Sequence, residues 1–343
     1  MKNTAIVILN WNGLKFLQQF LPNVVKHSES HASVWIVDNA STDDSVQWIK
    51  SEFPQVHVVQ NDENYGFARG YNEGLKSIDA KTYVLLNSDV QVSANWILPV
   101  LEAMDKSNFV ACQPKILSYA EPTKFEHAGA AGGFLDKNGY PFCRGRLFWE
   151  VENDEGQYDS QREIFWASGA CLFIRSEIYH NLGGLDADFF AHMEEIDLCW
   201  RIKNRGYKIG YTPDSTVFHV GGGTLSMMNP FKTYLNFRNN LFMLVKNYRS
   251  GSLFLKILQR LALDGIAAIR FLTEAKVSGF VSVFKSHMAF YSKLGTMLKR
   301  RKAENDFVHQ SNMAGWYSRS LLIDFMLKGK KKFRDLNQDS IKG

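Results

Sequence analysis

YVLLNSDVQV, residues 83–92, begins as a run of large apolar side chains and ends abruptly in polar ones. The apolar part, Tyr83–Leu86, is typical of a strand that is buried on both faces of a sheet. Asn87, Ser88 and Asp89 follow it at once. The Asp89 carboxylate either caps a helix beginning near Ser93, or simply ends the strand, or serves a chemical purpose at the edge of the sheet.

Strand-like and helix-like segments alternate before this stretch. The other strand-like runs are residues 4–9, 34–37 and 56–59. The segments with helical spacing of apolar residues are 13–26, 45–53 and 67–78. Strands that alternate with helices predict an α/β fold, in which a mostly parallel sheet is covered by helices. A second region, about 113–219, is expected to complete the sheet.

Polar residues follow the first two strands as well. In sheets of this kind, ligands bind beyond the carboxyl ends of the strands, where loops vary freely and helix N-termini point inward. Trp11, in the cluster Asn10-Trp11-Asn12, either stacks on a base or fills the core. Asp38 is able to accept the imide N–H of a uracil or thymine, although Asp38–Asp43 is also ordinary turn sequence.

Asp89 has the chemistry of a ligand for Mg²⁺ or Mn²⁺. A hard cation needs only one or two protein carboxylates when phosphate groups supply the remaining oxygens. His219 is a second candidate, because it follows a strand and precedes a glycine-rich stretch, Val220–Thr224, that would let the backbone approach a diphosphate. The alternative is that His219 fills the core.

Glu194 and Glu195 lie at the start of a predicted helix, residues 194–204. Carboxylates in a first helical turn are favoured by the helix dipole, which is one explanation for them. The other is that an ionised carboxylate in this position accepts a proton from a hydroxyl group. The sequence alone leaves both explanations open.

The chain of 343 residues has an ordinary globular composition, with 45% hydrophobic residues. Its charge is uneven: residues 251–343 contain 17 Lys and Arg against 7 Asp and Glu, whereas residues 1–250 contain 23 against 28. The basic part predicts attraction to an anionic surface, or simply a solvated tail. Lys330–Lys332 is expected to belong to a frayed end.

The part beyond about Met227 is predicted to form long helices. Lys256, Arg260 and Asp264 form a polar stripe beside a broad apolar face. Such a helix either docks on its own protein or lies on a membrane surface. The four cysteines form no Cys-x-x-Cys pair, and the N-terminus has no secretory apolar run. We therefore expect a cytoplasmic protein, with peripheral attachment to the inner face of the membrane as the open alternative.

Several nucleotide and hydrolase motifs are missing from the sequence. Gly66, Gly70 and Gly74 do not have the spacing of a dinucleotide fingerprint, and no P-loop occurs. His192-Met-Glu194 lacks the Pro-Cys-x-x-Cys of a zinc deaminase, and no Gly-x-Ser-x-Gly elbow is present. These observations weigh against a dehydrogenase, a P-loop NTPase, a zinc hydrolase and a serine esterase.

Taken in order, seven motifs resemble those of the inverting family 2 glycosyltransferases with the GT-A fold, especially the bacterial rhamnosyltransferase-like branch. The motifs are Ile6–Gly13, Val37–Asp43, Asn64–Asn72, Leu85–Val90, Ser168–Arg175, Glu194–Arg201 and His219–Gly222. The resemblance covers about residues 3–240. It implies a GT-A catalytic domain over residues 1–226 and a basic helical C-terminal region over residues 227–343.

The resemblance also implies roles for particular residues. The implied nucleotide-sugar-binding residues are Asn10, Trp11, Asp38, Asn64, Gly66, Phe67, Asn87 and Ser88. Asp89 and His219 would hold Mg²⁺ or Mn²⁺, and Glu195, with Glu194 beside it, would be the general base. The sequence departs from the family pattern twice, since Asn87 replaces the first acid of the metal motif and Glu195 stands where the family has aspartate.

The implied reaction moves a sugar from a UDP- or dTDP-linked donor, with rhamnose as one option, to an acceptor with inversion. The acceptor would be a saccharide or lipid-linked saccharide in cell-surface polysaccharide synthesis. Nucleic acid is not an expected partner. The alternative is a catalytically impaired sugar-nucleotide-binding protein.

Overall fold

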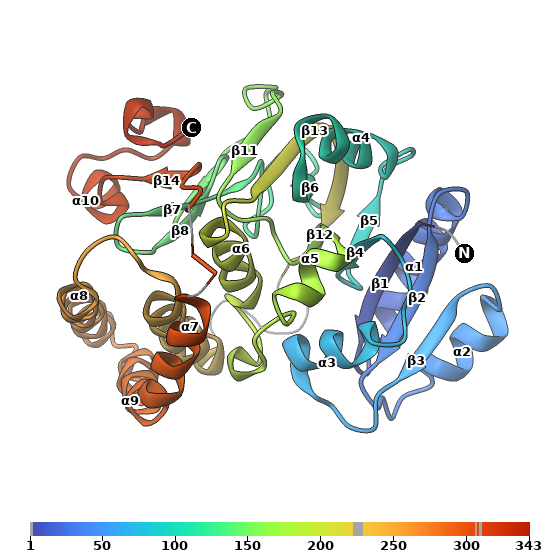
Figure 1. The fold of residues 1–343 in the computed structure, drawn as a ribbon, viewed down its shortest axis with the longest axis horizontal. Helices are drawn as coiled ribbons and strands as arrows, with labels where there is room; N and C mark the ends of the chain where they lie inside the picture. Colours follow the sequence, from blue (N-terminus) through green and yellow to red (C-terminus); the bar gives the residue numbers. More distant parts are fainter. Residues whose placement is uncertain (1–2, 222–228, 306, 309–310) are drawn as a thin grey trace.

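The computed structural model describes residues 3–221, 229–305, 307–308 and 311–343 (Figure 1). Within these residues the chain forms one large sheet and one small sheet, with helices packed around them. The large sheet holds the N-terminal strands, and the small sheet lies toward the C-terminal helices (Figure 1).

The N-terminal half of the large sheet is parallel and alternates with helices. Its strands are β1 (Thr4–Asn10), β2 (Ser33–Asp38), β3 (His57–Gln60) and β4 (Thr82–Leu86). The helices between them are α1 (Leu14–Ser28), α2 (Ser45–Glu52) and α3 (Gly66–Leu75). The strands lie in the order β4, β1, β2, β3, with parallel pairing throughout. The strands and helices expected here are confirmed, with small shifts at their ends.

The second region completes this sheet, as expected. Its strands are β5 (Val90–Val92), β6 (Phe109–Ser118), β11 (Arg162–Ile164), β12 (Cys171–Arg175) and β13 (Lys208–His219). The order continues from β4 through β12, β6 and β13 to β11, and β5 pairs with β13. β12 runs antiparallel to both of its neighbours, whereas β6 and β13 are parallel. The helical elements of this region are α4 (Leu98–Ser107), α5 (Ser176–Asn181), η1 (Ala187–Phe189) and α6 (Glu194–Asn204).

The residues after Asp89 form a strand. Val90–Val92 is β5, which pairs antiparallel with β13 and places Val92 opposite Val217. The next helix, α4, begins only at Leu98. The prediction of a helix near Ser93 is therefore wrong, because the pairing with β13 extends this segment. Asp89 does not cap a helix.

A small sheet, which the sequence did not predict, joins the middle of the chain to its C-terminal part. Its strands are β7 (Gly133–Asp136), β8 (Pro141–Cys143), β9 (Arg146–Leu147), β10 (Glu150–Val151) and β14 (Trp316–Tyr317). β14 pairs in parallel with β7. The short elements α10 (Leu321–Met326), η2 (Phe333–Asp335) and η3 (Gln338–Ser340) follow β14.

The expectation that Lys330–Lys332 belongs to a frayed end is wrong. Phe333, the next residue, is buried, and its ring packs on that of Phe134 with centroids 4.9 Å apart. The N–H of Phe333 also donates to Glu152 Oε1 at 3.0 Å. Burial of one large aromatic side chain in the small sheet fixes this end of the chain.

Three long helices make up most of the C-terminal region: α7 (Pro230–Asn247), α8 (Leu253–Thr273) and α9 (Val277–Asn305). α7 packs against both α6 and α9. The predicted boundary between residues 226 and 227 lies outside the described residues, as do Gly222, Gly223 and Thr224 of the glycine-rich stretch. None of the described helices has the length and apolar character needed to cross a membrane.

Alternate residues of the central strands face two separate hydrophobic clusters. In β1, Ala5 and Val7 belong to one cluster, whereas Ile6 and Ile8 belong to the other. Side chains point to opposite faces of a strand in turn, so both faces of the sheet are buried. This packing fixes the carboxyl ends of β1, β2 and β4, where the polar clusters of the sequence lie.

Candidate active site at the carboxyl ends of the strands

Asn10 and Asp38 end neighbouring strands and lie opposite each other in register. Asn10 Nδ2 donates to Asp38 Oδ1 at 2.9 Å and to Ser41 Oγ at 3.1 Å. Asp38 also accepts from the backbone N–H and the hydroxyl of Ser41, at 2.9 and 2.6 Å. Asp38 is completely buried, so in this conformation it organises the loop of residues 39–43. Asn10 and Asp38 are brought together as the sequence predicts.

Trp11 is 51% exposed, which rules out the explanation that it fills the core. The neighbouring Asn12 has a left-handed backbone, with φ of 50°. Its Oδ1 accepts from the backbone N–H groups of Thr42 and Asp43 at 2.7 and 3.3 Å. The loop after β1 is thereby tied to the loop after β2, and the Trp11 ring remains available for stacking on a planar group.

Asn64 lies just before α3, and Gly66 and Phe67 at the start of this helix contact the segment before α6. Asn64 Oδ1 accepts from the N–H of Gly66 at 3.0 Å. Gly66 has φ of +72°, and a Cβ there would lie 2.7 Å from the Phe190 ring, so this position requires glycine. The N–H of Phe67 donates to the carbonyl oxygen of Phe190 at 3.0 Å. The first turn of α3 and the loop before α6 are therefore in direct contact.

Asp89 and His219 meet where β5 pairs with β13. Asp89 Oδ1 lies 3.2 Å from His219 Nε2, and Asn87 Nδ2 lies 3.3 Å from the same ring nitrogen. Glu126, which the sequence did not single out, lies 3.4 Å from His219 Nδ1. Burial alone would lower the pKa of His219, but the Asp89 and Glu126 carboxylates raise it to about 10. His219 is buried, but it is held by carboxylates and does not act as apolar filling.

The donor set at this position fits a divalent cation. Two cis ligands at about 2.1 Å from one ion lie about 3 Å apart, which matches the spacing of Asp89 Oδ1 and His219 Nε2. Binding through Nε2 requires His219 to lose the proton from that nitrogen. No group of three or more His, Cys, Asp and Glu side chains in the described part of the chain has the arrangement of a metal site.

Glu194 and Glu195 occupy the first turn of α6, as predicted. Burial raises the pKa of Glu195 to about 7. Burial, with repulsion from Glu195, raises the pKa of Glu194 well above its ordinary value. Within the described residues, one oxygen of each carboxyl is buried without a hydrogen-bond partner. Buried polar atoms normally have a partner, so these two oxygens have bonding capacity left for a further group.

The backbone of Ser168–Ala170 joins Glu195 to the end of β4. A Cβ at Gly169 would lie 3.6 to 3.8 Å from the Cβ, Cγ and Cδ atoms of Glu195, so this side chain packs over the glycine. The next carbonyl, that of Ala170, accepts the N–H of Asn87 at 3.0 Å. Glu195 and Asn87, which begins the group with Asp89 and His219, therefore contact neighbouring residues of this short backbone segment.

The loop before α6 is strained and is held by α7. Positive φ angles of 66°, 68° and 72° occur at Phe190, His192 and Met193. Asn239 Nδ2 donates to three carbonyl oxygens of the 189–192 segment at 2.7 to 3.0 Å. Arg238 Nη2 donates to two carbonyl oxygens of the same loop at 2.9 and 3.0 Å. The sequence signal for these residues was the polar run Arg238–Asn240 within an otherwise apolar helical pattern.

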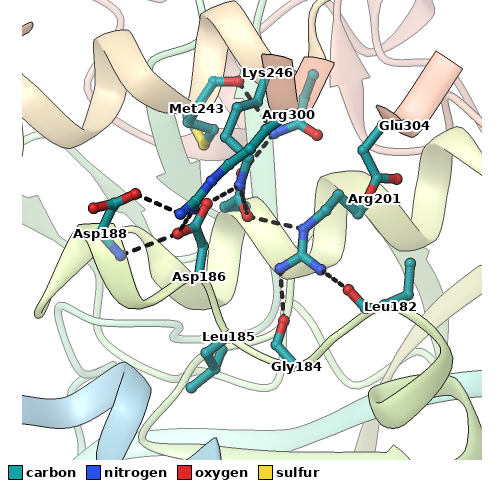
Figure 2. A network of polar contacts seen from close by, with 12 residues as sticks. Leu182, Gly184, Leu185, Asp186, Asp188, Arg201, Met243, Lys246, Arg300 and Glu304 are labelled. Atoms are coloured by element: carbon teal, nitrogen blue, oxygen red, sulfur yellow. Dashed lines mark hydrogen bonds and ion pairs between the residues drawn. The ribbon is translucent and has the colours of Figure 1, made fainter. Parts of the chain in front are cut away.

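A buried network of charges continues this support into α9 (Figure 2). Asp186 pairs with Lys246 on α7 at 2.5 Å and with Arg300 on α9. Burial alone would raise the pKa of Asp186, but Lys246 and Arg300 hold it well below the ordinary value. Arg201 on α6 donates to the carbonyl oxygens of Leu182 and Gly184 at 2.7 and 2.8 Å. The segment leading to Glu194 and Glu195 is therefore clamped between α6, α7 and α9.

Comparison with known proteins relates this site to a family. A family model described as Glycosyl transferase family 2 matches residues 5–183, just over half of the chain. The low-salt glycan biosynthesis hexosyltransferase of Haloferax volcanii is 21% identical over 292 residues, which is 81% of this chain and 87% of that protein. The N-acetylglucosaminyl-diphospho-decaprenol L-rhamnosyltransferase of Mycobacterium tuberculosis is 24% identical over 230 residues, 62% of this chain and 75% of that protein.

The fold is shared with a solved glycosyltransferase. The mannosyltransferase PcManGT from Pyrobaculum calidifontis, in complex with GDP-Man and Mn²⁺, superimposes with a TM-score of 0.52 at 13% identity. The match covers 90% of this chain and 89% of that one, which confirms the expected GT-A fold. The resemblance drawn from the seven motifs is confirmed as well, and the chain belongs to glycosyl transferase family 2.

Proposed function

We propose that this protein transfers a sugar from a UDP- or dTDP-linked donor to a saccharide or lipid-linked saccharide, with inversion at the anomeric carbon. Membership of family 2 supports the reaction class. Relatives named for glycan biosynthesis and for rhamnosyl transfer support an acceptor in cell-surface polysaccharide synthesis, with rhamnose as one donor sugar. The reaction would take place on the cytoplasmic side of the cell membrane.

The observation that carries this proposal is the arrangement around Asn87. Asn87 follows the end of β4. His219 Nε2 lies 3.3 Å from Asn87 Nδ2 and 3.2 Å from Asp89 Oδ1. Glu195 packs over the backbone that Asn87 contacts. A diphosphate bound beside Asp89 and His219 would then adjoin a carboxyl group, that of Glu195, whose pKa is about 7.

On the donor side, Trp11 would stack on the pyrimidine base, beside the loop that Asp38 and Asn10 organise. Asp38 Oδ2 accepts one hydrogen bond, from Ser41, so it retains a lone pair for the base imide once residues 39–43 shift. Asn64, Gly66 and Phe67 would line the sugar, together with Asn87 and Ser88. A divalent metal on Asp89 and His219 would offset the negative charge of the departing diphosphate.

On the acceptor side, Glu195 would act as the general base. It takes the proton of the acceptor hydroxyl while that oxygen forms a bond to the anomeric carbon. The bond between the anomeric carbon and the diphosphate oxygen breaks in the same step, and the nucleoside diphosphate leaves with the electron pair. Glu194, whose pKa burial and the neighbouring Glu195 raise well above its ordinary value, would remain protonated and neutral next to the base.

A donor panel tests this proposal. UDP-, dTDP- and GDP-sugars are offered with Mn²⁺ and a saccharide acceptor, and release of the nucleoside diphosphate is measured. We expect release from a UDP- or dTDP-sugar that depends on the acceptor. Donor binding with neither transfer nor hydrolysis would instead favour the catalytically impaired binding protein.

A further inference from the structure

We propose that the outer side of α8, together with Trp149 and α10, is a docking surface for an anionic lipid bilayer. We define the α8 face as the large apolar side chains of α8 that point to solvent. They are Phe254, Leu255, Leu258, Ile266, Ile269 and Leu272.

Helix α8 buries its charged stripe together with Leu253, Ile257 and Leu261, which pack on the core, and turns its other large apolar side chains to solvent. Arg260 and Asp264 are only 4% and 0% exposed, whereas Phe254 and Ile266 are 74% and 63% exposed. A surface helix of a globular protein normally shows the reverse arrangement. The sequence left open whether this helix docks on its own protein or on a membrane. It docks on the protein through its charged stripe and the neighbouring Leu253, Ile257 and Leu261, and this contact leaves the α8 face uncovered.

The buried stripe fixes the rotation of the helix. Arg260 Nε donates to Asp264 Oδ1 at 2.7 Å, and its guanidinium lies 4.1 Å from the centre of the Tyr140 ring. Arg260 also donates to Asn240 on α7. Turning α8 to bury its apolar side would separate Arg260 from Asn240 and from the Tyr140 ring, whereas the Arg260–Asp264 pair lies within α8 and would turn with it.

The apolar surface continues from α8 onto α10. Arg270, near the end of α8, lies 5.6 Å from the ring centre of Trp149, which is half exposed. Trp149 packs on Phe325 of α10 with ring centroids 4.8 Å apart. The exposed apolar residues of α10 and just after it are Ile323, Met326 and Leu327, the last of which is 80% exposed. An apolar patch of this extent is rare on a monomeric soluble protein.

Cations border this patch. Lys331 and Lys332 follow shortly after Leu327 in the chain, and Lys328 and Lys330 between them pair with Asp324. Lys331 lies 3.6 Å from the ring centre of Phe325 and 5.8 Å from that of Trp149. Exposed aliphatic residues, a tryptophan and clustered lysines are the features with which a protein surface binds anionic headgroups and inserts among acyl chains.

The charges also argue against a second copy as the occupant. A two-fold interface brings the same patch of two subunits together. Such pairing would gather the lysines of both subunits at one interface, whereas an anionic bilayer neutralises them. A membrane-bound enzyme would reach the lipid-linked acceptor of the proposed function, and in this respect the docking surface rests on that function. Lipid binding itself is measured without donor or acceptor.

The test is co-sedimentation of the full chain with vesicles. Phosphatidylcholine vesicles with and without phosphatidylglycerol are compared, and we expect binding to the anionic vesicles that weakens as salt rises. The variant with Leu258→Glu, Ile266→Glu and Ile269→Glu should bind them at least about tenfold more weakly. The control variant carries Gln18→Glu, Gln47→Glu and Ser51→Glu on exposed positions of α1 and α2, which adds the same charge, and it should bind like the wild type.

A second variant, Lys331→Gln with Lys332→Gln, should weaken binding to anionic vesicles by roughly tenfold or more and leave binding to neutral ones unchanged. Absence of wild-type binding to anionic vesicles, or equal binding by the α8 variant, would overturn the proposal. So would a vesicle-free dimer that the α8 variant converts to monomer, because the face would then be an interface between copies. A shift in melting temperature by a nucleotide sugar tests the proposed function separately.

Discussion

Replacing Glu195 by glutamine should abolish transfer and, at the same time, stabilise the protein above neutral pH. At low pH the Glu195 carboxyl is protonated in both the folded and the unfolded chain, so its titration does not change the free energy of unfolding there. Its pKa rises from an ordinary 4.5 to about 7 on folding. As pH rises through this interval, the unfolded chain loses the proton first, and the folded state is disfavoured by up to about 3 kcal/mol. Glutamine removes that penalty.

The loss of rate follows from the role of Glu195 as base. Removal of a general base typically slows the chemical step by about a hundredfold to ten-thousandfold. Donor binding should be unchanged, because the proposed role of Glu195, which packs over Gly169, is to take the proton of the acceptor hydroxyl. The wild-type rate should rise with pH toward a plateau above about pH 7, since Glu195 must be ionised to accept the proton. Burial raises the pKa of Glu195, and hydrogen bonds with the backbone at Met193, Glu195 and Ile196 oppose that rise.

The assay combines three measurements on wild type, Glu195→Gln and Glu194→Gln. Denaturant unfolding at about pH 5 and about pH 8.5 gives the stability difference, calorimetry gives donor affinity, and product formation gives the rate. Glu194→Gln is the matched control, since it removes the adjacent buried carboxyl and should retain transfer. Undiminished transfer by Glu195→Gln would refute its assignment as base, and equal stabilisation at both pH values would refute the burial argument.

Three other changes test the surroundings of the site. Asn239→Ala should lower kcat by roughly tenfold or more, because it frees the strained loop before α6. The control is Asn229→Ala, which removes the N-cap of α7, the helix that also carries Asn239. It should cost about 1 kcal/mol of stability and leave kcat unchanged. Lys246→Met leaves the buried carboxylates of Asp186 and Asp197 without this partner and should lower the free energy of unfolding, measured with denaturant, by about 3 to 5 kcal/mol. Lys293→Met breaks a more exposed pair and should lower it by at most about 1 kcal/mol. Asn87→Asp should let the donor-free protein bind Mn²⁺, as measured by electron paramagnetic resonance, whereas the wild type should bind Mn²⁺ only together with the nucleoside diphosphate. Tight binding of Mn²⁺ by the donor-free wild type would contradict this expectation.

The local elements of the fold were predictable, because they depend on neighbours in the sequence. β1 to β4 and α6 follow from apolar runs and helical spacing, and their polar ends identified Asp38, Asp89 and Glu195. β5 was missed, since Val90–Val92 becomes a strand only through its pairing with β13. The two- and three-residue strands of the small sheet were missed for the same reason.

Partners from distant parts of the chain were beyond the reach of sequence patterns. Nothing local marks Glu126 as a neighbour of His219, or Asn239 as the support of the loop before α6. The pattern of α8 gave one polar and one apolar side, but not which of them faces the protein. Asn240 and Tyr140, both remote in sequence, decide that by receiving Arg260.

The most direct measurement is Mn²⁺-dependent release of nucleoside diphosphate from a sugar-nucleotide panel, with the anomeric configuration of the product determined by nuclear magnetic resonance. The account predicts that a UDP- or dTDP-sugar is consumed, that the product has the opposite configuration to the donor, and that Asp89→Asn and Glu195→Gln each suppress the reaction. A product that retains the donor configuration, or release that persists in both variants, would contradict it.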